Sequence, residues 1–323
     1  MLLDNLTQAI GATPLVRLSR MFPDSAVYAK LELCNPGGSV KDRPARYIIE
    51  QGLAESSLRA GMHVIESSSG NFAIALALLC ATHRLRFTAV VDPNISAANL
   101  KIIRCYGGLI DMVRACDEHG GYLQARIDRV GQLLAADPQA IWINQYANAR
   151  NWLAHFHGEG AELATALAAD PPDALVLGVS TSGTLHGIAR RLKQAWPALR
   201  VIAVDALGSV LFGGTPALRK LPGIGASRVP ELLRRDEVDE VVWVDDYDAS
   251  MACRALTLHE GIFAGGSSGA VIAALQRLAA QDALPPRVVT LLPDRGERYL
   301  DTVYNDAWLA DASERHRRTA LVA

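Results

Sequence analysis

The chain has 323 residues, 50% of them hydrophobic, and a formal net charge of −2. This length and composition predict a substantial core divided between two lobes, and the absence of a basic run before Arg315–Arg318 argues against a nucleic-acid partner. The sequence has no apolar stretch suited to a bilayer and no signal peptide, and its five cysteines form no CxxC, which predicts a cytoplasmic protein without a metal site.

Short apolar runs alternate with helical patterns along most of the chain, which is typical of α/β proteins with parallel sheets covered by helices. The predicted strands are Val27–Leu33, His63–Ser67, Phe87–Val91, Leu109–Val113, Ile141–Gln145, Leu175–Val179, Val201–Asp205, Val241–Val244 and Val288–Leu292. The predicted helices are Ala73–Leu85, Ala97–Tyr106, Tyr122–Ala135, Leu185–Trp196, Ala249–His259 and Gly269–Ala280, besides one through Arg46–Ile49. We expect a long functional loop over Gly208–Val229 and a frayed tail over Ala312–Ala323.

One lysine stands out, Lys41 in the segment Asn35–Arg43 (NPGGSVKDR). A Gly/Pro turn precedes it, Ser39 is a candidate helix cap, and a helix follows. The positive end of a helix disfavours an ammonium ion, which helps to make a nucleophilic amine. Only five of the 32 basic residues are lysines, so charge alone is mostly supplied by arginine. The alternative is an ordinary surface lysine.

Three further motifs follow predicted strands and open helices: Glu66–Asn71 (ESSSGN), Ser180–Thr184 (STSGT) and Ala264–Gly269 (AGGSSG). Ligands of open α/β sheets bind at the carboxyl ends of strands, and helix N-termini rich in hydroxyls hold carboxylates or phosphates. The third motif could instead place a neutral hydroxyl against a heteroaromatic nitrogen. Each motif could also be a simple helix cap. His155 and His157 lack an evident third ligand, so a structural role is favoured over metal binding.

In this order, these motifs resemble the pyridoxal-phosphate (PLP) β-replacement family that contains cysteine synthase and cystathionine β-synthase. Ile10–Leu18 (IGATPLVRL) and Gly296–Leu300 (GERYL) match it as well, and the likeness runs from about Leu6 to Trp308. The resemblance implies fold-type II, with two three-layer α/β/α lobes and mostly parallel sheets. It implies a smaller mobile lobe over residues 35–144, a larger PLP-binding lobe over 1–34 and 145–323, and a homodimer.

The resemblance also assigns roles to residues. Lys41 would bind PLP covalently as an imine and then move the Cα proton of the substrate. Asn71 would bond the ring hydroxyl, and Ser267 would face the pyridine nitrogen. The cofactor phosphate would be surrounded by Ser180, Thr181, Ser182, Gly183 and Thr184, and the substrate carboxylate would be held by Ser67, Ser68, Ser69, Gly70 and Asn71.

Within the family, the chain is similar to a siderophore-pathway branch that joins O-phospho-L-serine to L-glutamate through an aminoacrylate and releases phosphate. The supporting segments are Asn35–Ala45, Ala89–Ser96, Asp117–Leu123, Trp142–Asn148, Leu221–Glu231 and Leu292–Asp301. Ser180 and Tyr146 stand where sulfide-using members usually have glycine and phenylalanine, and they add hydroxyls that suit a polar nucleophile.

Two arginines are predicted to contact the substrates. Arg126 is the candidate for the leaving phosphate, since guanidinium pairs bidentately with phosphate, and it could equally be a solvated helix arginine. Arg228 is a weaker candidate for a substrate carboxylate. The alternatives left open are a cysteine synthase using O-acetylserine or O-phosphoserine with sulfide, a serine/threonine dehydratase, and a catalytically idle PLP-binding protein.

Overall fold

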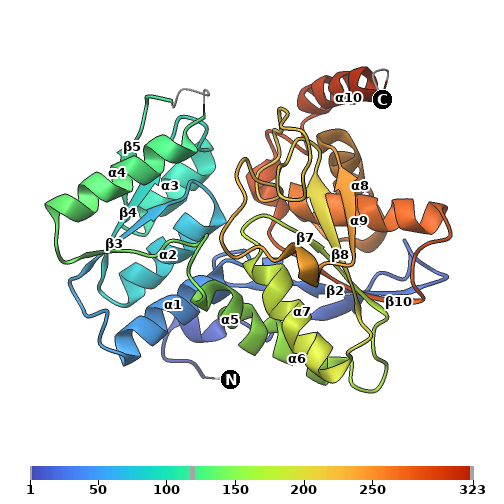
Figure 1. Ribbon diagram of the computed structural model, residues 1–323, viewed down its shortest axis with the longest axis horizontal. Coiled ribbons are helices and arrows are strands. Elements are labelled where there is room, and N and C mark those ends of the chain that lie inside the picture. Colours follow the sequence, from blue (N-terminus) through green and yellow to red (C-terminus); the bar gives the residue numbers. More distant parts are fainter. Residues whose placement is uncertain (1, 117–120, 321–323) are drawn as a thin grey trace. The chain divides into compact units, whose positions relative to one another are not determined.

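The structure is a computed structural model that describes residues 2–116 and 121–320 (Figure 1). The chain divides into two compact units, each with its own parallel sheet. The first unit comprises Met1–Ile10 and Asn35–Ala154, and the second comprises Gly11–Cys34 and His155–Ala323. Residues 1–10 and 145–154, which the sequence assigned to the larger lobe, therefore group with the first unit. That residues 35–144 form a mobile lobe stays a prediction.

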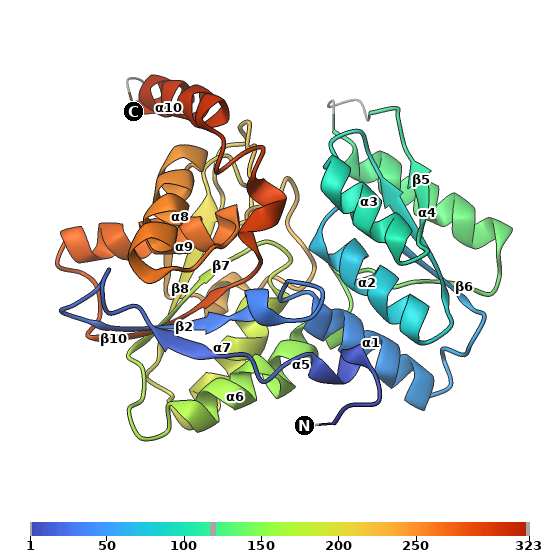
Figure 2. The same cartoon turned by 180° about the vertical axis from the view of Figure 1, so that it is seen from behind.

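The sheet of the first unit has the strand order β5-β4-β3-β6, all parallel. Its strands are β3 (His63–Ser67), β4 (Arg86–Val91), β5 (Leu109–Met112) and β6 (Ala140–Trp142). Its helices are α1 (Asp42–Ala54), α2 (Asn71–Thr82), α3 (Ala97–Cys105) and α4 (Leu123–Ala136). In Figures 1 and 2, α2 and α3 cover one face of this sheet and α4 covers the other. Because α2 is apolar on nearly every side, it is buried almost throughout.

The sheet of the second unit has the order β1-β2-β10-β7-β8-β9, in which only β1 is antiparallel among the described strands. Its strands are β1 (Leu15–Arg17), β2 (Ala26–Leu31), β7 (Ala174–Gly178), β8 (Arg200–Ala206), β9 (Glu240–Val244) and β10 (Arg287–Leu292). Helix α5 (Arg150–His157) crosses the boundary between the units. The helices of the second unit are α6 (Glu159–Ala166), α7 (Gly183–Ala195), α8 (Asp246–Glu260), α9 (Gly266–Ala280) and α10 (Asp306–Ala320). Short 3₁₀ turns occur at Leu6–Ala9, Glu32–Cys34, Arg235–Glu237 and Gly296–Tyr299.

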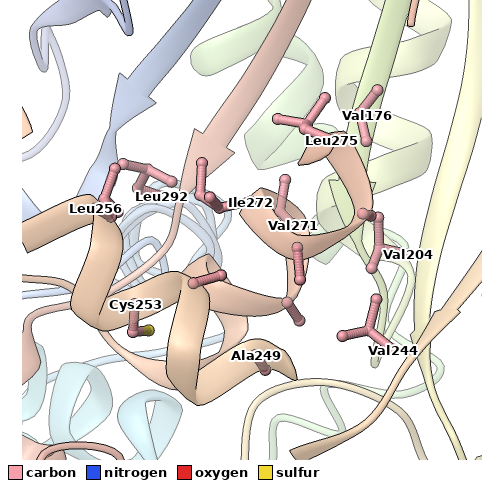
Figure 3. Close-up of a cluster of buried hydrophobic side chains, with 14 of the residues drawn as sticks. Val176, Val204, Val244, Ala249, Cys253, Leu256, Val271, Ile272, Leu275 and Leu292 are labelled. Atoms are coloured by element: carbon pink, nitrogen blue, oxygen red, sulfur yellow. The ribbon is translucent and has the colours of Figure 1, made fainter. Parts of the chain in front are cut away.

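Helices cover both faces of the second sheet, so this unit is also a three-layer α/β/α structure. In Figure 2, α8 and α9 lie on one face and α6 and α7 on the other. Figure 3 shows the core under α9, where Val271, Ile272 and Leu275 meet the strand residues Val176 and Val204. Valine-rich strands buried on both sides are what a sheet between two helical layers requires.

Most predicted elements are confirmed, including all nine strands, although ends shift by a few residues. Strand β1 and helices α5, α6 and α10 were not predicted. The frayed tail is wrong as far as residue 320, because α10 continues there and Arg315 anchors it to Asp246 at 2.8 Å and stacks 5.8 Å from the Trp308 ring centroid. Residues 321–323 lie outside the described residues, as do residues 117–120 of the Asp117–Leu123 motif.

The predicted loop Gly208–Val229 is confirmed, since it contains neither helix nor strand. Arg219 holds it together by donating to the Gly208 carbonyl at 3.3 Å and to the Ser227 hydroxyl at 2.9 Å. Within residues 2–116 and 121–320, none of the helices has the length and apolar character needed to cross a membrane.

Candidate active site

Lys41 occupies the N-cap of α1, directly after the glycine turn. The turn is fixed by the fully buried Asp42, whose carboxylate accepts the Gly37 N–H at 2.5 Å. A Cβ on Gly37 would collide with that carboxylate, so only glycine fits there. Ser39 is not the N-cap itself, because the helix begins at Asp42 and Lys41 is its N-cap; the Ser39 hydroxyl accepts the Lys41 N–H at 3.3 Å instead. The backbone of Lys41 is thus fixed by the preceding turn and by the helix that follows it.

The motif after β3 forms the head of α2. Ser67 ends the strand, Gly70 is the N-cap and Asn71 is the first helical residue. Ser67 and Ser68 are buried, and the Ser67 hydroxyl has no hydrogen-bond partner within the described part of the chain. The Asn99 side chain of α3 donates to the Ser69 carbonyl at 3.1 Å and orients the loop. A buried hydroxyl at a helix N-terminus suits an incoming carboxylate.

Glu66, the residue before this motif, is completely buried. Burial raises its pKa to about 8, although the backbone N–H groups of Asn144 and Gln145 and the Trp142 indole oppose this shift. A carboxyl group that keeps its proton below about pH 8 therefore lies beside the segment that follows β6. No role was predicted for Glu66, although an acidic residue at the end of an apolar strand is a signal for one.

The carboxyl ends of β3, β4 and β6 meet at one edge of the parallel sheet, which brings the predicted substrate residues of this unit together. Asp92 follows β4, and its carboxylate lies 3.2 Å from the guanidinium of Arg126 on α4. Both side chains are largely buried, at 8% and 12% exposed. Arg126 is therefore not a solvated helix arginine, and a phosphate bound there would share it with Asp92. Tyr146, half-buried, follows β6 at the same edge.

In the second unit, Ser180–Thr184 connects β7 to α7. Ser182 is the N-cap and has the left-handed backbone torsion φ = +72°. Its hydroxyl is buried and lacks a hydrogen-bond partner among residues 2–116 and 121–320. Thr181 is also buried, and Gly183 begins the helix. A helix N-terminus and an unsatisfied hydroxyl are together suited to an anion, which is the predicted role of this cup.

Ser180 has a contact that the sequence did not indicate. Its hydroxyl donates to the Gly225 carbonyl at 3.1 Å, and the Gly225 N–H donates to the Val179 carbonyl at 2.7 Å. These two bonds tie the Gly208–Val229 loop to the end of β7. The role of Ser180 toward phosphate or substrate stays a prediction.

Ser267 lies near the same place at the head of α9. It is buried, and a Cβ built on Gly223 of the loop would lie 3.7 Å from its hydroxyl oxygen. A Cβ built on Gly178, at the end of β7, would lie 3.8 Å from the Ser267 carbonyl oxygen. The structure thus brings Ser267, the loop and the end of β7 together. Arg228 is different, because it pairs with Glu231 at 2.7 Å in a partly exposed surface ion pair.

His155 and Glu159 have a contact that the sequence analysis missed. His155 Nδ1 lies 2.9 Å from Glu159 Oε1, and His155 Nε2 lies 3.2 Å from the Thr184 hydroxyl. The i,i+4 spacing of a histidine and a glutamate was the available signal.

These features fit PLP. The cup at Ser180–Thr184, with its unsatisfied Ser182 hydroxyl, can hold a phosphate, and the Ser267 hydroxyl is a neutral group for a pyridine nitrogen. Lys41, held at the start of α1, can supply the amine, and Asn71 can supply an amide for a ring hydroxyl. These individual contacts stay predictions.

Curated relatives cover almost the whole chain. It is 64% identical over 312 residues to the N-(2-amino-2-carboxyethyl)-L-glutamate synthase of Ralstonia nicotianae, covering 96% of this chain and 92% of that protein. It is 61% identical over 328 residues to the enzyme of the same name from Cupriavidus metallidurans, covering 100% and 96%.

Solved structures give the same picture of the fold. O-ureido-L-serine synthase is 33% identical and has a TM-score of 0.86, with 96% of this chain and 100% of that chain covered. The O-acetylserine dependent cystathionine β-synthase of Helicobacter pylori is 32% identical and has a TM-score of 0.87, with 94% and 100% covered. The chain thus has the fold-type II structure expected from its sequence. Residues 6–294 match the model of one family, and the chain belongs to it: the pyridoxal-phosphate dependent enzymes.

Proposed function

We propose that this enzyme joins O-phospho-L-serine to L-glutamate, giving N-(2-amino-2-carboxyethyl)-L-glutamate and phosphate. The carrying observation is the identity of 64% and 61% to two synthases of that name over almost the full chain. In the balanced reaction, the Cβ–O bond of phosphoserine breaks, a bond forms between Cβ and the glutamate nitrogen, and that nitrogen loses a proton.

Lys41 is the proposed catalytic residue. Bound PLP would supply an electron sink that stabilises negative charge at the substrate Cα. The Lys41 amine would remove the Cα proton and later return one, which requires an amine that is neutral near working pH. Ser267, a neutral hydroxyl rather than a carboxylate, would leave the pyridine nitrogen unprotonated and so favour departure of the Cβ substituent.

The remaining predicted residues would recognise the substrates. Ser67, Ser68, Ser69 and Gly70 would bind the carboxylate of phosphoserine at the head of α2. The buried position of Arg126 supports a role with the leaving phosphate, since a guanidinium in low dielectric binds phosphate strongly. Tyr146, at the same strand edge, would contact the glutamate, and Arg228 would need to leave Glu231 to bind a carboxylate.

The wider biological setting belongs to the same proposal. The product would be a precursor of L-2,3-diaminopropionate for a siderophore of the staphyloferrin B type. The enzyme would work as a cytoplasmic homodimer, in which residues 35–144 form the mobile lobe. Light scattering of the purified protein measures the mass, and a monomer at working concentration would contradict the dimer.

The test is to mix the PLP-loaded enzyme with O-phospho-L-serine and either L-glutamate or sulfide. We expect phosphate release that depends on glutamate and a product with the mass of the adduct. Lys41→Ala should lower turnover by at least about a thousandfold, since it removes the group that moves the proton. Turnover with sulfide alone would instead assign the enzyme as a cysteine synthase, and phosphate release with neither nucleophile would indicate a dehydratase.

A further inference from the structure

Two arginines of α4, one turn apart, are each paired with an aspartate from the sheet of the first unit. Arg129 donates three hydrogen bonds to Asp111 of β5, at 2.8, 3.0 and 3.1 Å. The contact of Arg126 with Asp92 is looser, since Nη1 lies 3.2 Å from Oδ2. Arg126 Nε is buried and has no hydrogen-bond partner among the residues that the structure describes. The guanidinium of Arg126 is therefore less completely paired than that of Arg129.

Burial makes this difference important. The side chains of Arg129 and Asp111 are 40% and 21% exposed, so water can complete their hydrogen bonding. Those of Arg126 and Asp92 are only 12% and 8% exposed. A buried N–H without a partner costs free energy, and a guanidinium has five N–H groups in a planar arrangement that suits a phosphate. Arg126 therefore has hydrogen-bonding capacity left for a second anion beside Asp92.

The carboxylate of Asp92 is held in place by its own turn. Asp92 directly follows β4, and its Oδ1 accepts the Asn94 N–H at 2.9 Å, while Oδ2 faces Arg126. Its orientation therefore does not depend on Arg126 alone. An anion that binds the Arg126 guanidinium must lie close to this fixed negative charge.

The strand register places Asp92 beside the residues predicted to hold the substrate carboxylate. Ser67 of β3 pairs with Val90 of β4 in the parallel sheet, so the chains that follow these two strands leave the sheet next to each other. Asn99 of α3 joins them, because its side chain donates to the Ser69 carbonyl at 3.1 Å. Asp92 and Arg126 thus lie at the strand edge where phosphoserine is expected to bind.

We propose that Asp92 weakens the binding of phosphate at Arg126, so that the phosphate released from phosphoserine leaves the site readily. The inference rests on the proposed role of Arg126 toward the leaving phosphate. Asp92 is a positioning residue here, because it acts through the guanidinium that it shares with the phosphate. In the absence of phosphate, Asp92 neutralises a buried cation that would otherwise be costly. When phosphate is present, the two anions compete for the same N–H groups.

The experiment measures inorganic phosphate as a competitor of O-phospho-L-serine on the PLP-loaded enzyme. Asp92→Asn removes the negative charge and keeps the shape and a carbonyl oxygen for the Asn94 N–H. We expect the inhibition constant of phosphate to fall about tenfold, since a like charge nearby opposes the binding of an anion. The affinity for L-serine, which lacks the phosphate, should not change. The matched control is Asp111→Asn, which alters the other ion pair of α4 and should leave the inhibition constant unchanged.

A variant of Arg126 separates this inference from the proposed function on which it rests. Arg126→Gln should raise the inhibition constant of phosphate at least about tenfold, because it removes a charge-assisted interaction. If Arg126→Gln has no effect, the assignment of Arg126 to the leaving phosphate is wrong. If Arg126→Gln weakens phosphate binding but Asp92→Asn does not tighten it, only the role of Asp92 is wrong. Equal weakening of phosphate and L-serine in Asp92→Asn would show that Asp92 is merely structural.

A crystal structure of the wild-type holoenzyme with inorganic phosphate covers the case in which Asp92→Asn does not fold. A phosphate oxygen should lie within hydrogen-bonding distance of the Arg126 guanidinium. It should also lie within about 6 Å of the Asp92 carboxylate, the range in which like charges oppose each other strongly. Phosphate bound at Arg126 but beyond this range, or bound away from Arg126, would overturn the proposal.

Discussion

At the scale of single residues, the candidate site combines a lysine at a helix N-terminus with polar groups that burial has altered. Glu66 illustrates this best. Its carboxyl group is completely buried beside the segment that follows β6, and exclusion from water raises its pKa from 4.5 to about 8. A neutral acid there places no negative charge next to the predicted substrate-binding residues Ser67–Gly70.

This pKa predicts a pH-dependent stability. Between pH 4.5 and about 8, folded Glu66 keeps its proton while the unfolded chain releases it, so stability falls as pH rises through this window. The contribution is at most about 1.4 kcal/mol per pH unit. Glu66→Gln removes this slope and should therefore gain stability relative to wild type as pH rises. Melting temperatures measured across the window test this, with Glu50→Gln on α1 as control; parallel curves for Glu66→Gln and wild type would contradict it.

The sequence alone indicated the residues that are predicted to contact the cofactor or substrate. It did not indicate the residues that pack against them. Lys41, Ser67–Asn71, Ser180–Thr184 and Ser267 follow strands or turns and were found by their local patterns. The contacts of Glu66, His155 and Glu159 join separate elements, such as the 3.2 Å contact from His155 to Thr184 across 29 residues, and no local pattern indicates them. The same holds for the pairing of Arg126 with Asp92.

At the scale of elements, glycine determines how closely α8 and α9 pack. A Cβ on Gly269 would collide with the Ala249 carbonyl oxygen and the Cys253 sulfur of α8. The same helix carries Ser267 two residues earlier, so this close packing also fixes the position of a predicted cofactor contact. Glycine in AGGSSG thus serves helix packing as well as a turn.

Gly269→Ala should destabilise the protein by about 1–3 kcal/mol, as expected for overpacking in a close-packed interior. The matched control is Gly131→Ala within α4, where an added Cβ meets nothing within 4 Å. That change should be neutral or stabilising by up to about 1 kcal/mol, because alanine favours helix over glycine. Urea unfolding measures both. Equal effects of the two substitutions would refute the packing argument.

Element boundaries were less predictable than the elements themselves. β1 has three residues and no room for a periodic pattern, while α5 and α6 are eight residues each and only partly apolar. The polar helix α10 reads as a tail in sequence because its order comes from tertiary ion pairs such as Arg315–Asp246. Such ion pairs join residues that are far apart in the chain, so no short stretch of sequence indicates them.

At the scale of the whole molecule, the alternation of strands and helices was sufficient to predict parallel sheets covered by helices, while the two α/β/α lobes were implied by the family resemblance. The order of strands, such as β2 beside β10, was not accessible, since strand pairing across more than 250 residues leaves no local trace. The motif sequences and their order did indicate the family, because together they resemble those of the PLP β-replacement enzymes.

Cofactor binding should stabilise the whole protein by mass action. Free PLP at 100 times its dissociation constant adds about 2.7 kcal/mol to the free energy of unfolding, so removal of PLP should lower the melting temperature by several degrees. Calorimetry of apoenzyme and holoenzyme measures the difference. Lys41→Ala keeps the predicted phosphate cup but cannot form the covalent bond, so removal of PLP should lower its melting temperature by less. An equal decrease in the two proteins would argue against Lys41 as the attachment point.

The left-handed backbone conformation of Ser182 has a consequence for the evolution of this position. A non-glycine residue at φ = +72° costs on the order of 1 kcal/mol, so glycine would serve the bare fold better. What serine adds is a hydroxyl at the head of α7. Mutation toward glycine is therefore opposed only while an anion is bound there. In relatives that no longer bind the cofactor, Ser182 should be among the first positions to be substituted. The residue found at this position would then indicate whether the cup still binds an anion.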